Sequence, residues 1–421
     1  MSALVLFGTL FILIVIGVPI ALSLGVTSMV TMLYLNVPLT VVAQRTFTAL
    51  DSYAIMAIPL FILAGNLMTT GGISRRLVVF INNLVGRVRG GMAHAIVVAC
   101  AFFAALSGSG PATVIAIGST LYPEIVKLGY PKERCAGLLA VAGSLGPIIP
   151  PSIALVVYAT IVNCSVGHLF TAGLIAGIMV AGVLLIVCAI YAKKENWPRN
   201  ETRITSGEMF MSFIRALPAL GLPIIILGGI YSGYLTPTES ASIAVIYAYL
   251  VGVFLYREMS HKKMLSLLFD SAKNSAMILF IIATSSSFSW IFTYSGISRT
   301  MTNAIIGMNM SATVFCIAAT MVFLFFGFFL EGIAMLVLFI PVVWPIAESL
   351  GVNVIHFGMI IKMAGGVGAM TPPVAVNVFA AASVSGLKIG EIAKGQLPFF
   401  LGFMMVLVII QFFPWFSTFF I

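Results

Sequence analysis

Charged residues are scarce in this chain: Asp, Glu, Lys and Arg make up 8% of its 421 residues, whereas hydrophobic residues make up 61%. Soluble globular proteins carry about 25% charged residues, so the composition excludes an ordinary soluble domain and indicates an integral membrane protein. The formal net charge is +9, but the basic residues stand between apolar segments. Because they form no basic patch with interleaved aromatic residues, we expect no nucleic-acid partner.

Cysteines and common catalytic motifs are equally sparse. The five cysteines stand apart, mostly within apolar runs, and have no CxxC or other metal-ligand spacing, so we interpret them as small buried hydrophobes. The sequence has no GxxxxGK[ST] phosphate-binding loop, which argues against an ATP-driven pump. The first basic residue is Arg45, so we predict no cleaved signal peptide.

Apolar segments dominate the rest of the chain and predict an all-α polytopic membrane protein. About 20 apolar residues cross a bilayer as a helix, and length and helix breakers place about ten crossings. The expected crossings are 4–16, 19–35, 53–68, 135–163, 170–191, 213–231, 239–256, 277–292, 357–385 and 399–419. The segment 73–88 mixes apolar residues with arginines, so we expect it to lie in the membrane interface without crossing.

Two of these crossings contain strong helix breakers. The run 135–163 is interrupted by Gly143-Ser-Leu-Gly146-Pro-Ile-Ile-Pro150-Pro-Ser152, and the run 357–385 by Gly365-Gly-Val-Gly368-Ala-Met-Thr371-Pro-Pro. Glycines and paired prolines remove helical hydrogen bonds at a depth where lipid offers no substitute partner. We therefore predict two broken helices whose freed backbone groups line a protected site.

Two further apolar segments are interrupted by polar tips. The segment 92–126 contains Ser107-Gly-Ser109-Gly-Pro111, and the segment 312–347 contains Leu330-Glu331-Gly332. The arms on each side are expected to be too short to span a bilayer, so each segment is predicted to be a re-entrant helical hairpin.

The tips and the breaks recur at a constant shift of 222 residues, from 143 to 365, which predicts an internal repeat. The first repeat is expected over 1–192 and the second over 209–421, joined by a cytoplasmic connector, 193–208. Five crossings in each half, an odd number, make the second repeat inverted. Basic loops stay cytoplasmic, which places both termini in the periplasm.

Discontinuous helices at corresponding positions of inverted halves indicate a transporter binding site. Unwound carbonyls suit Na+, and half-helix N-termini suit a carboxylate. We expect no Lys or Arg at the depth of this site, because Lys362 is placed near the outer face. An anionic substrate would then be held by helix dipoles, hydroxyl groups and a bound cation.

Several candidate side chains have two readings. Ser144 either faces the site or bonds its own helix backbone. Glu331 is either a functional intramembrane acid or a helix cap, and Glu239 fits a helix cap. Asn66 and Asn377 either contact substrate or join helices.

The segments Ser107 to Pro111, Gly146 to Ser152, Thr236-Pro-Thr-Glu239 and Gly365 to Pro373 resemble those of the large membrane subunit of tripartite ATP-independent periplasmic (TRAP) transporters. The resemblance spans essentially the whole chain. It implies membership of the ion-transporter superfamily, an elevator mechanism, coupling to two or more Na+ ions and a location in the bacterial inner membrane. It also implies three partners: a small four-helix membrane subunit, a periplasmic substrate-binding protein and a small carboxylate, of the C4-dicarboxylate or sialic acid class.

Site residues follow from this resemblance and from the tips and breaks. The predicted Na+ ligands are Ser107, Ser109, Gly143, Gly146, Glu331, Gly332, Gly365, Gly368 and Thr371. The predicted substrate contacts are Ser107, Ser109, Pro150, Ser152, Asn377 and Asn66.

Two alternatives remain open. One is a carboxylate carrier or exporter of the same superfamily that works without a binding protein. The other is an intramembrane serine hydrolase, because Ser107-Gly-Ser109 resembles the exposed serine of a membrane protease. Such a serine needs a nearby base, and we expect no His or Lys at that depth. We therefore predict that the protein is not an enzyme.

Overall fold

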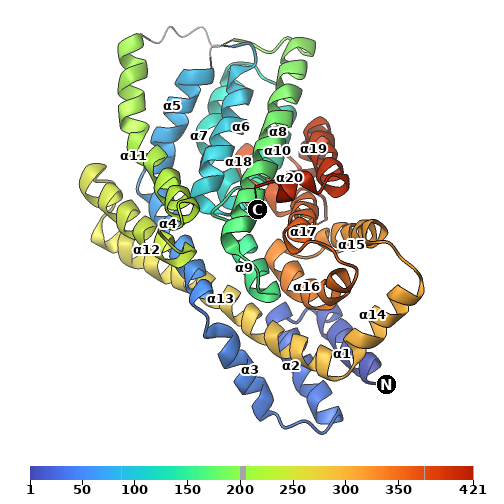
Figure 1. Cartoon of the computed structure of the whole chain (residues 1–421). Helices are drawn as coiled ribbons and strands as arrows, with labels where there is room; N and C mark the ends of the chain where they lie inside the picture. Colours follow the sequence, from blue (N-terminus) through green and yellow to red (C-terminus); the bar gives the residue numbers. More distant parts are fainter. Residues whose placement is uncertain (87, 200–204, 374, 421) are drawn as a thin grey trace.

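The computed structural model describes residues 1–86, 88–199, 205–373 and 375–420, and every regular element within these ranges is a helix (Figure 1). The predicted all-α fold is confirmed. Among the described residues, seven helices are long and apolar enough to cross a membrane by length and composition: Tyr53–Thr70, Val166–Lys194, Ser206–Tyr231, Pro237–Leu255, Lys262–Tyr294, Gly332–Ser349 and Ile389–Phe412. The protein is therefore a multi-pass membrane protein.

The first half of the chain forms α1 (Ser2–Val15), α2 (Ile20–Tyr34), α3 (Thr40–Leu50), the short turn η1 (Tyr53–Met56), α4 (Ala57–Thr70), α5 (Ile73–Val85), α6 (Gly91–Ser107), α7 (Gly110–Lys127), α8 (Lys132–Gly143), α9 (Ile153–Val162) and α10 (Val166–Lys194). The second half forms α11 (Ser206–Tyr231), α12 (Pro237–Leu250), η2 (Val251–Leu255), α13 (His261–Tyr294), α14 (Ile297–Gly307), α15 (Ala312–Gly327), α16 (Gly332–Ser349), α17 (Val354–Ala369), α18 (Val376–Ser385), α19 (Ile389–Phe412) and α20 (Trp415–Thr418). The predicted connector, 193–208, lies partly outside the described residues, as does Arg87. The repeat bounds and the inversion stay predictions.

Both predicted hairpins are present as pairs of helices in contact. α6 packs on α7, with a turn at Gly108, and α15 packs on α16, with a turn before Glu331. The arms of the first pair have 17 and 18 residues and are longer than expected, but neither is among the helices long and apolar enough to cross a membrane. In the second pair, α16 has 18 residues and is among them. Proline does not end these arms, because Pro123 and Pro341 both lie inside helices.

Both broken helices are present as well. α8 ends at Gly143 and α9 begins at Ile153, while α17 ends at Ala369 and α18 begins at Val376. Gly365 and Gly368 therefore lie inside the last turns of α17, rather than in unwound backbone as predicted. A glycine there permits close packing, since a Cβ on Gly368 would lie 2.5 Å from the Gly327 carbonyl oxygen of α15.

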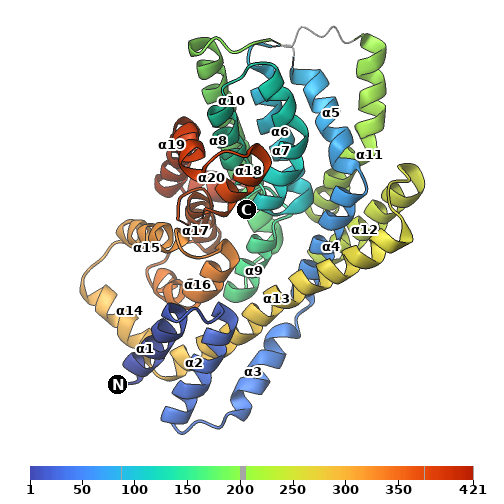
Figure 2. The ribbon, with the colours of Figure 1, turned by 180° about the vertical axis from the view of Figure 1, so that it is seen from behind.

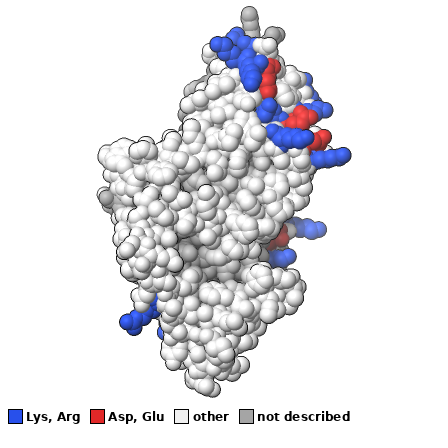
Figure 3. Space-filling model, turned by 90° about the vertical axis from the view of Figure 1, so that its right-hand side faces the viewer, with Lys and Arg blue, Asp and Glu red and all other residues white. Residues whose placement is uncertain are grey.

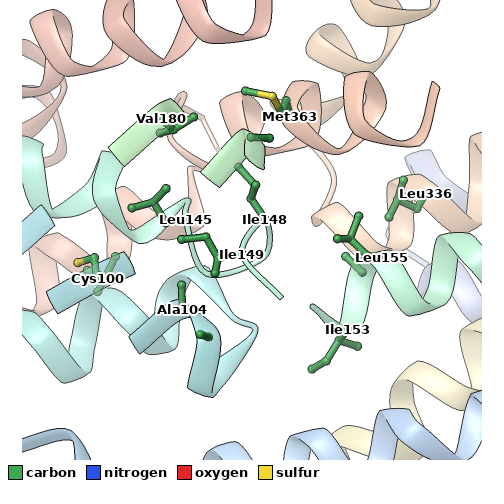
Figure 4. Close-up of a cluster of buried hydrophobic side chains, with 14 of the residues drawn as sticks. Cys100, Ala104, Leu145, Ile148, Ile149, Ile153, Leu155, Val180, Leu336 and Met363 are labelled. Carbon is green, nitrogen blue, oxygen red and sulfur yellow. The ribbon is translucent and has the colours of Figure 1, made fainter. Parts of the chain in front are cut away.

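The unwound segment between α8 and α9 is anchored by apolar side chains. Leu145, Ile148 and Ile149 are buried, and Figure 4 shows them in a cluster that includes Cys100 of α6 and Val180 of α10. Burial of these side chains stabilises the segment by the hydrophobic effect, and by dispersion where lipid replaces water outside. The helix break is thus a packed part of the fold.

Two elements differ from the prediction. The segment 40–50, expected to be a connection, is the helix α3, which packs on α13. The basic stretch 257–273 and the crossing 277–292 were expected to be separate, but one helix of 34 residues, α13, covers most of both. Its sequence contains neither glycine nor proline, so nothing interrupts helical hydrogen bonding.

The long helix α13 connects helices from both halves of the chain. α13 packs on α2, α3 and α4, and also touches α16; seen from both sides, it runs diagonally across the molecule (Figures 1 and 2). The hairpins and broken helices pack mainly on one another and cross between halves. α9 contacts α16, and α18 contacts α7 and α8.

On the face in Figure 3, many of the charged residues lie toward one end, at the top, with smaller groups at the right edge and the lower left; most of this face is uncharged. Interactions tie this end together: Arg134 forms an ion pair with Glu195 at 3.0 Å, and the Tyr130 hydroxyl donates to the Pro198 carbonyl at 2.9 Å. The C-terminal ends of α7 and α10 and the N-terminal end of α8 therefore lie on the same side of the molecule. The cytoplasmic position of the connector, 193–208, stays a prediction.

Close contact between α8 and α19 generates a stability prediction. A Cβ on Gly395 would lie 2.0 Å from the Glu133 carbonyl oxygen, which is too close for any side chain. Gly395→Ala should force the helices apart and cost about 1–3 kcal/mol, seen as a lower thermal unfolding midpoint of the purified protein. Gly390→Ala is the matched control, because Gly390 lies on the same helix with open space around it. Equal midpoints for the two variants would contradict the packing.

Candidate functional site

The hairpin tips and the broken helices surround one cavity of about 290 Å³. This volume is at the lower end of the range for small-molecule sites. The part of the lining that comes from tips and breaks is Ser107, Gly108, Ser109, Gly110, Pro111, Ala112, Pro147, Ile153, Ala154, Glu331, Gly332, Ile333, Lys362, Gly365, Gly366, Ala369, Val376 and Asn377. Segments more than 200 residues apart in sequence therefore share one chamber.

The remaining wall comes from α4 and α13. The contributing residues are Ile62, Gly65, Asn66 and Thr69 of α4, and Asn274, Met277 and Ile278 of α13. Both sets follow helical spacing, so each is one face of its helix. The Asn66 amide nitrogen donates to the Ser271 hydroxyl at 2.8 Å, which means that Asn66 joins α4 to α13 and also faces the cavity.

The first tip is held in shape by its own hydroxyl groups. The Thr113 hydroxyl donates to the Ser109 carbonyl at 2.7 Å and lies 3.0 Å from the Ser107 hydroxyl oxygen. The Ser109 backbone N–H donates to the Ser107 hydroxyl at 3.3 Å. Ser107 is therefore engaged by its neighbours, and its hydroxyl contacts no basic side chain among the described residues.

Asn377 connects the second broken helix to the first. Its amide nitrogen donates to the Ser144 hydroxyl at 2.9 Å and to the Ala140 carbonyl at 3.3 Å. Its amide oxygen is fully buried and has no hydrogen-bond partner in the described part of the chain. A Cβ on Gly110 would lie 2.6 Å from that oxygen, so the unpartnered oxygen faces the backbone of the first tip.

The second tip carries a carboxylate that serves as a helix cap. The Glu331 side chain accepts hydrogen bonds from the backbone N–H groups of Ile333 and Ala334 at 2.9 and 3.2 Å. The capping role predicted as one alternative is therefore present. Glu239 also forms a capping box, with Thr236.

One sequence expectation about the site is wrong. We expected no basic residue at the site and placed Lys362 near the outer face, but its side chain is 4% exposed and lines the cavity. The reason lies in helix geometry: Lys362, Gly365, Gly366 and Ala369 are one face of α17. Since Gly365 was assigned to the site, this spacing was the signal that identifies Lys362.

The first residues of four helices line the cavity. These are α7, α9, α16 and α18, which begin at Gly110, Ile153, Gly332 and Val376. A helix N-terminus presents unpaired N–H groups and a partial positive charge. Side chains cap two of these ends, Glu331 at α16 and Ser152 at α9, whereas the ends of α7 and α18 have no side-chain cap. The two uncapped ends, together with Lys362, make a surrounding that favours an anion.

Six predicted site residues lie outside the cavity lining: Gly143, Gly146, Pro150, Ser152, Gly368 and Thr371. The structure gives several of them packing contacts. The Ser152 hydroxyl donates to the Pro147 carbonyl at 2.6 Å, and the Thr371 hydroxyl donates to the Val367 carbonyl at 2.8 Å. A Cβ on Gly146 would lie 2.5 Å from the Ser109 carbonyl oxygen. Their assignments as ligands stay predictions.

Residues that the sequence reasoning missed are Lys362, Thr69 and Asn274. Thr69 lies one turn from Asn66 on α4, so the predicted Asn66 was a signal for it. Asn274 lies between the expected basic stretch, 257–273, and the expected crossing, 277–292, and only the continuous helix α13 brings it to the site. No local feature of its sequence indicates this position.

A helical membrane protein with a cavity that is lined by two hairpin tips and two broken helices, and that carries a few polar groups on a mostly apolar wall, belongs to the class of transporters. The sequence matches, over residues 7–416, the family described as "Tripartite ATP-independent periplasmic transporter, DctM component". The chain belongs to this family, and the predicted resemblance to TRAP large subunits is confirmed. Its relatives are named as transporter permeases, which agrees with the prediction that it is not an enzyme.

Individual relatives cover nearly the whole chain. The C4-dicarboxylate TRAP transporter large permease protein DctM of Rhodobacter capsulatus is 37% identical and covers 98% of this chain and 97% of its own length. The isethionate TRAP transporter permease protein DctMQ of Oleidesulfovibrio alaskensis is 38% identical over 99% of this chain and 66% of its own length. The crystal structure of the Alcanivorax borkumensis YdaH transporter is similar in fold, with a TM-score of 0.62, 16% identity and coverage of 91% of this chain and 89% of that chain.

The contact between the first break and the first tip generates a prediction about the site. Gly146→Ala places a methyl group against the Ser109 carbonyl, so the tip has to move at a strain of about 1–3 kcal/mol. Substrate affinity should fall roughly tenfold or more, measured as a raised KM for uptake in proteoliposomes. Gly182→Ala on α10 is the control, because Gly182 has open space around it. A wild-type KM for Gly146→Ala would show that the tip position does not matter.

Proposed function

We propose that this chain is the large permease of a Na+-coupled importer of a small carboxylate, of the C4-dicarboxylate or sialic acid class. The observation that carries the proposal is the single cavity shared by both hairpin tips, both broken helices, α4 and α13. Such a chamber brings helix N-termini, unwound backbone and polar side chains to one small molecule. These are the features that bind substrate and coupling ion in transporters with broken helices.

The case for a carboxylate substrate is electrostatic. The lining combines four helix N-termini with the ammonium group of Lys362, whereas Glu331 is the one carboxylate among the described lining residues. Because the Glu331 carboxylate caps α16, part of its charge is used by that helix. The Rhodobacter relative named for C4-dicarboxylates supports this substrate class.

The case for Na+ rests on a buried oxygen atom that accepts no hydrogen bond within the described residues. Na+ prefers oxygen ligands, as do other hard cations. The buried Asn377 amide oxygen at the first tip is such an atom, and its orientation is set by the amide nitrogen, which donates to the Ala140 carbonyl. Asn377, which we assigned to substrate, therefore fits a cation, together with the predicted ligands Ser107 and Ser109 of the tip.

The position of the cavity supports an elevator mechanism. One wall belongs to the tips and broken helices, and the other belongs to α4 and α13. Movement of the first group along the second would carry a bound molecule across the membrane without dismantling the tips. α13, which packs on α2, α3 and α4, would be the fixed element.

Partners are inferred from the family. Its description as a tripartite, ATP-independent periplasmic transporter component supports two further components, for which we propose a small four-helix membrane subunit and a periplasmic binding protein. We also propose a location in the inner membrane of a bacterium, with both termini in the periplasm because basic loops stay cytoplasmic.

Uptake into proteoliposomes tests this function. Vesicles that contain this chain and its small subunit should accumulate labelled succinate or N-acetylneuraminate when an inward Na+ gradient and the binding protein are both present. The reason is that Na+ moving down its gradient supplies the driving force. A K+ gradient of the same size is the control. Full-rate uptake without the binding protein would instead support the carrier alternative, and uptake that is indifferent to Na+ would refute the coupling.

The cation assignment of Asn377 gives a sharper prediction. Asn377→Leu keeps the side-chain volume but removes the amide oxygen, so the Na+ concentration for half-maximal uptake should rise about tenfold, equivalent to about 1.4 kcal/mol. The measurement is a Na+ titration at saturating substrate.

Ser144→Ala is the matched control for that variant. It removes the same hydrogen bond between Asn377 and Ser144 but leaves the amide oxygen in place, so its Na+ titration should stay close to that of the wild type. An equal shift in both variants would show that the hydrogen bond, and not the oxygen, matters.

A further inference from the structure

Lys362 is an unusual residue for the interior of a membrane protein. Its side chain is 4% exposed, on a helix whose residues from Ile355 to Gly368 are all buried. A Cβ on Gly332 would lie 3.8 Å from its Nζ atom, so the ammonium group lies beside the second hairpin tip and faces the cavity.

The ammonium group has no protein partner in the described part of the chain. No hydrogen bond and no ion pair within 4.0 Å engages it, since the described ion pairs involve Arg75, Arg76 and Arg134 only. Glu331, the nearest candidate, is exposed and directs one carboxylate oxygen to the N–H groups of Ile333 and Ala334. The ammonium group of Lys362 is therefore free to bind a ligand inside the cavity.

Burial of an unpaired charge is costly, whereas a buried charge with an ionic partner and good hydrogen bonds is tolerated. Ionisable residues inside membrane proteins accordingly mark substrate or ion pathways. A cation as partner is excluded by like charge. A neutral molecule would leave the ammonium group without its counter-charge, so an anion is the partner that fits.

We infer that Lys362 binds an anionic group of the transported substrate and is a specificity-determining residue of this chain. The inference rests on the proposed carboxylate transport and adds the residue that holds the charge. The ammonium group offers three N–H donors to a carboxylate at the second tip. The uncapped N-terminus of α7 lies at the opposite tip and remains available for the cation or for a second polar group of the substrate.

Ligand-induced thermal stabilisation of the purified full-length chain in NaCl tests the inference without the partner proteins. Succinate, N-acetylneuraminate and isethionate are titrated against the wild type, Lys362→Gln and Lys362→Arg. At least one anion should stabilise the wild type, and Lys362→Gln should weaken its Kd about 10- to 100-fold, the range for a hydrogen bond to a charged group. Lys362→Arg, which keeps the positive charge, should recover most of the affinity.

Lys127→Gln is the matched control, because Lys127 is exposed at the end of α7, away from the cavity lining. A wild-type Kd is expected for it. If Lys362→Gln does not fold, Lys362→Met, which has an unbranched side chain of similar length, provides the same comparison. For the best anion, the corresponding uptake assay should show a raised KM with little change in maximal rate, a split that a merely structural role would not produce.

Each adverse result has a distinct meaning. Stabilisation of the wild type by none of the anions would overturn both the proposed function and this inference. Stabilisation of the wild type with an unchanged Kd in Lys362→Gln would overturn the inference alone. Recovery of wild-type affinity in the double variant Glu331→Gln, Lys362→Gln would also overturn it, because Lys362 would then only balance the charge of Glu331.

Discussion

The structure depends on one constraint: backbone polar groups cannot remain unpaired and exposed to lipid. The two broken helices leave some backbone groups without helical hydrogen bonds. Backbone from other segments packs against the breaks and separates these groups from lipid. Gly108 of the first tip approaches the Pro151 carbonyl, and Gly146 of the first break approaches Ser109. These contacts need glycine, because any Cβ would occupy the space of a carbonyl group. The first tip therefore stabilises the first break by covering its unwound backbone.

The two halves of the chain complete each other at this point. Asn377 of the second half donates to Ser144 and Ala140 of the first half, and α9 of the first half packs on α16 of the second. Neither half has a closed cavity lining of its own. The chamber therefore lies at the interface between the two halves of the chain.

Charge is used sparingly inside this protein. Most of the face in Figure 3 is uncharged, and in the described cavity lining only Lys362 and Glu331 carry formal charge. In a medium of low polarity, a single ammonium group and oriented helix ends have larger effects than they would in water. A few groups would therefore suffice for the anion binding that we propose, in a chain with a strongly apolar composition.

The sequence alone determined the membrane class, the family, both breaks and both tips, because glycine, proline and long apolar runs act locally on helix formation. Of the residues that it assigned to the site, Ser107, Ser109, Glu331 and Asn377 line the cavity. It did not determine the continuous helix α13, the exact ends of α17 or the position of Lys362. Those features depend on which helix faces meet: Asn274 and Lys362 come to one chamber only when α13 and α17 pack around the tips. Local propensity says where a helix ends, but contacts between distant segments decide what its side chains surround.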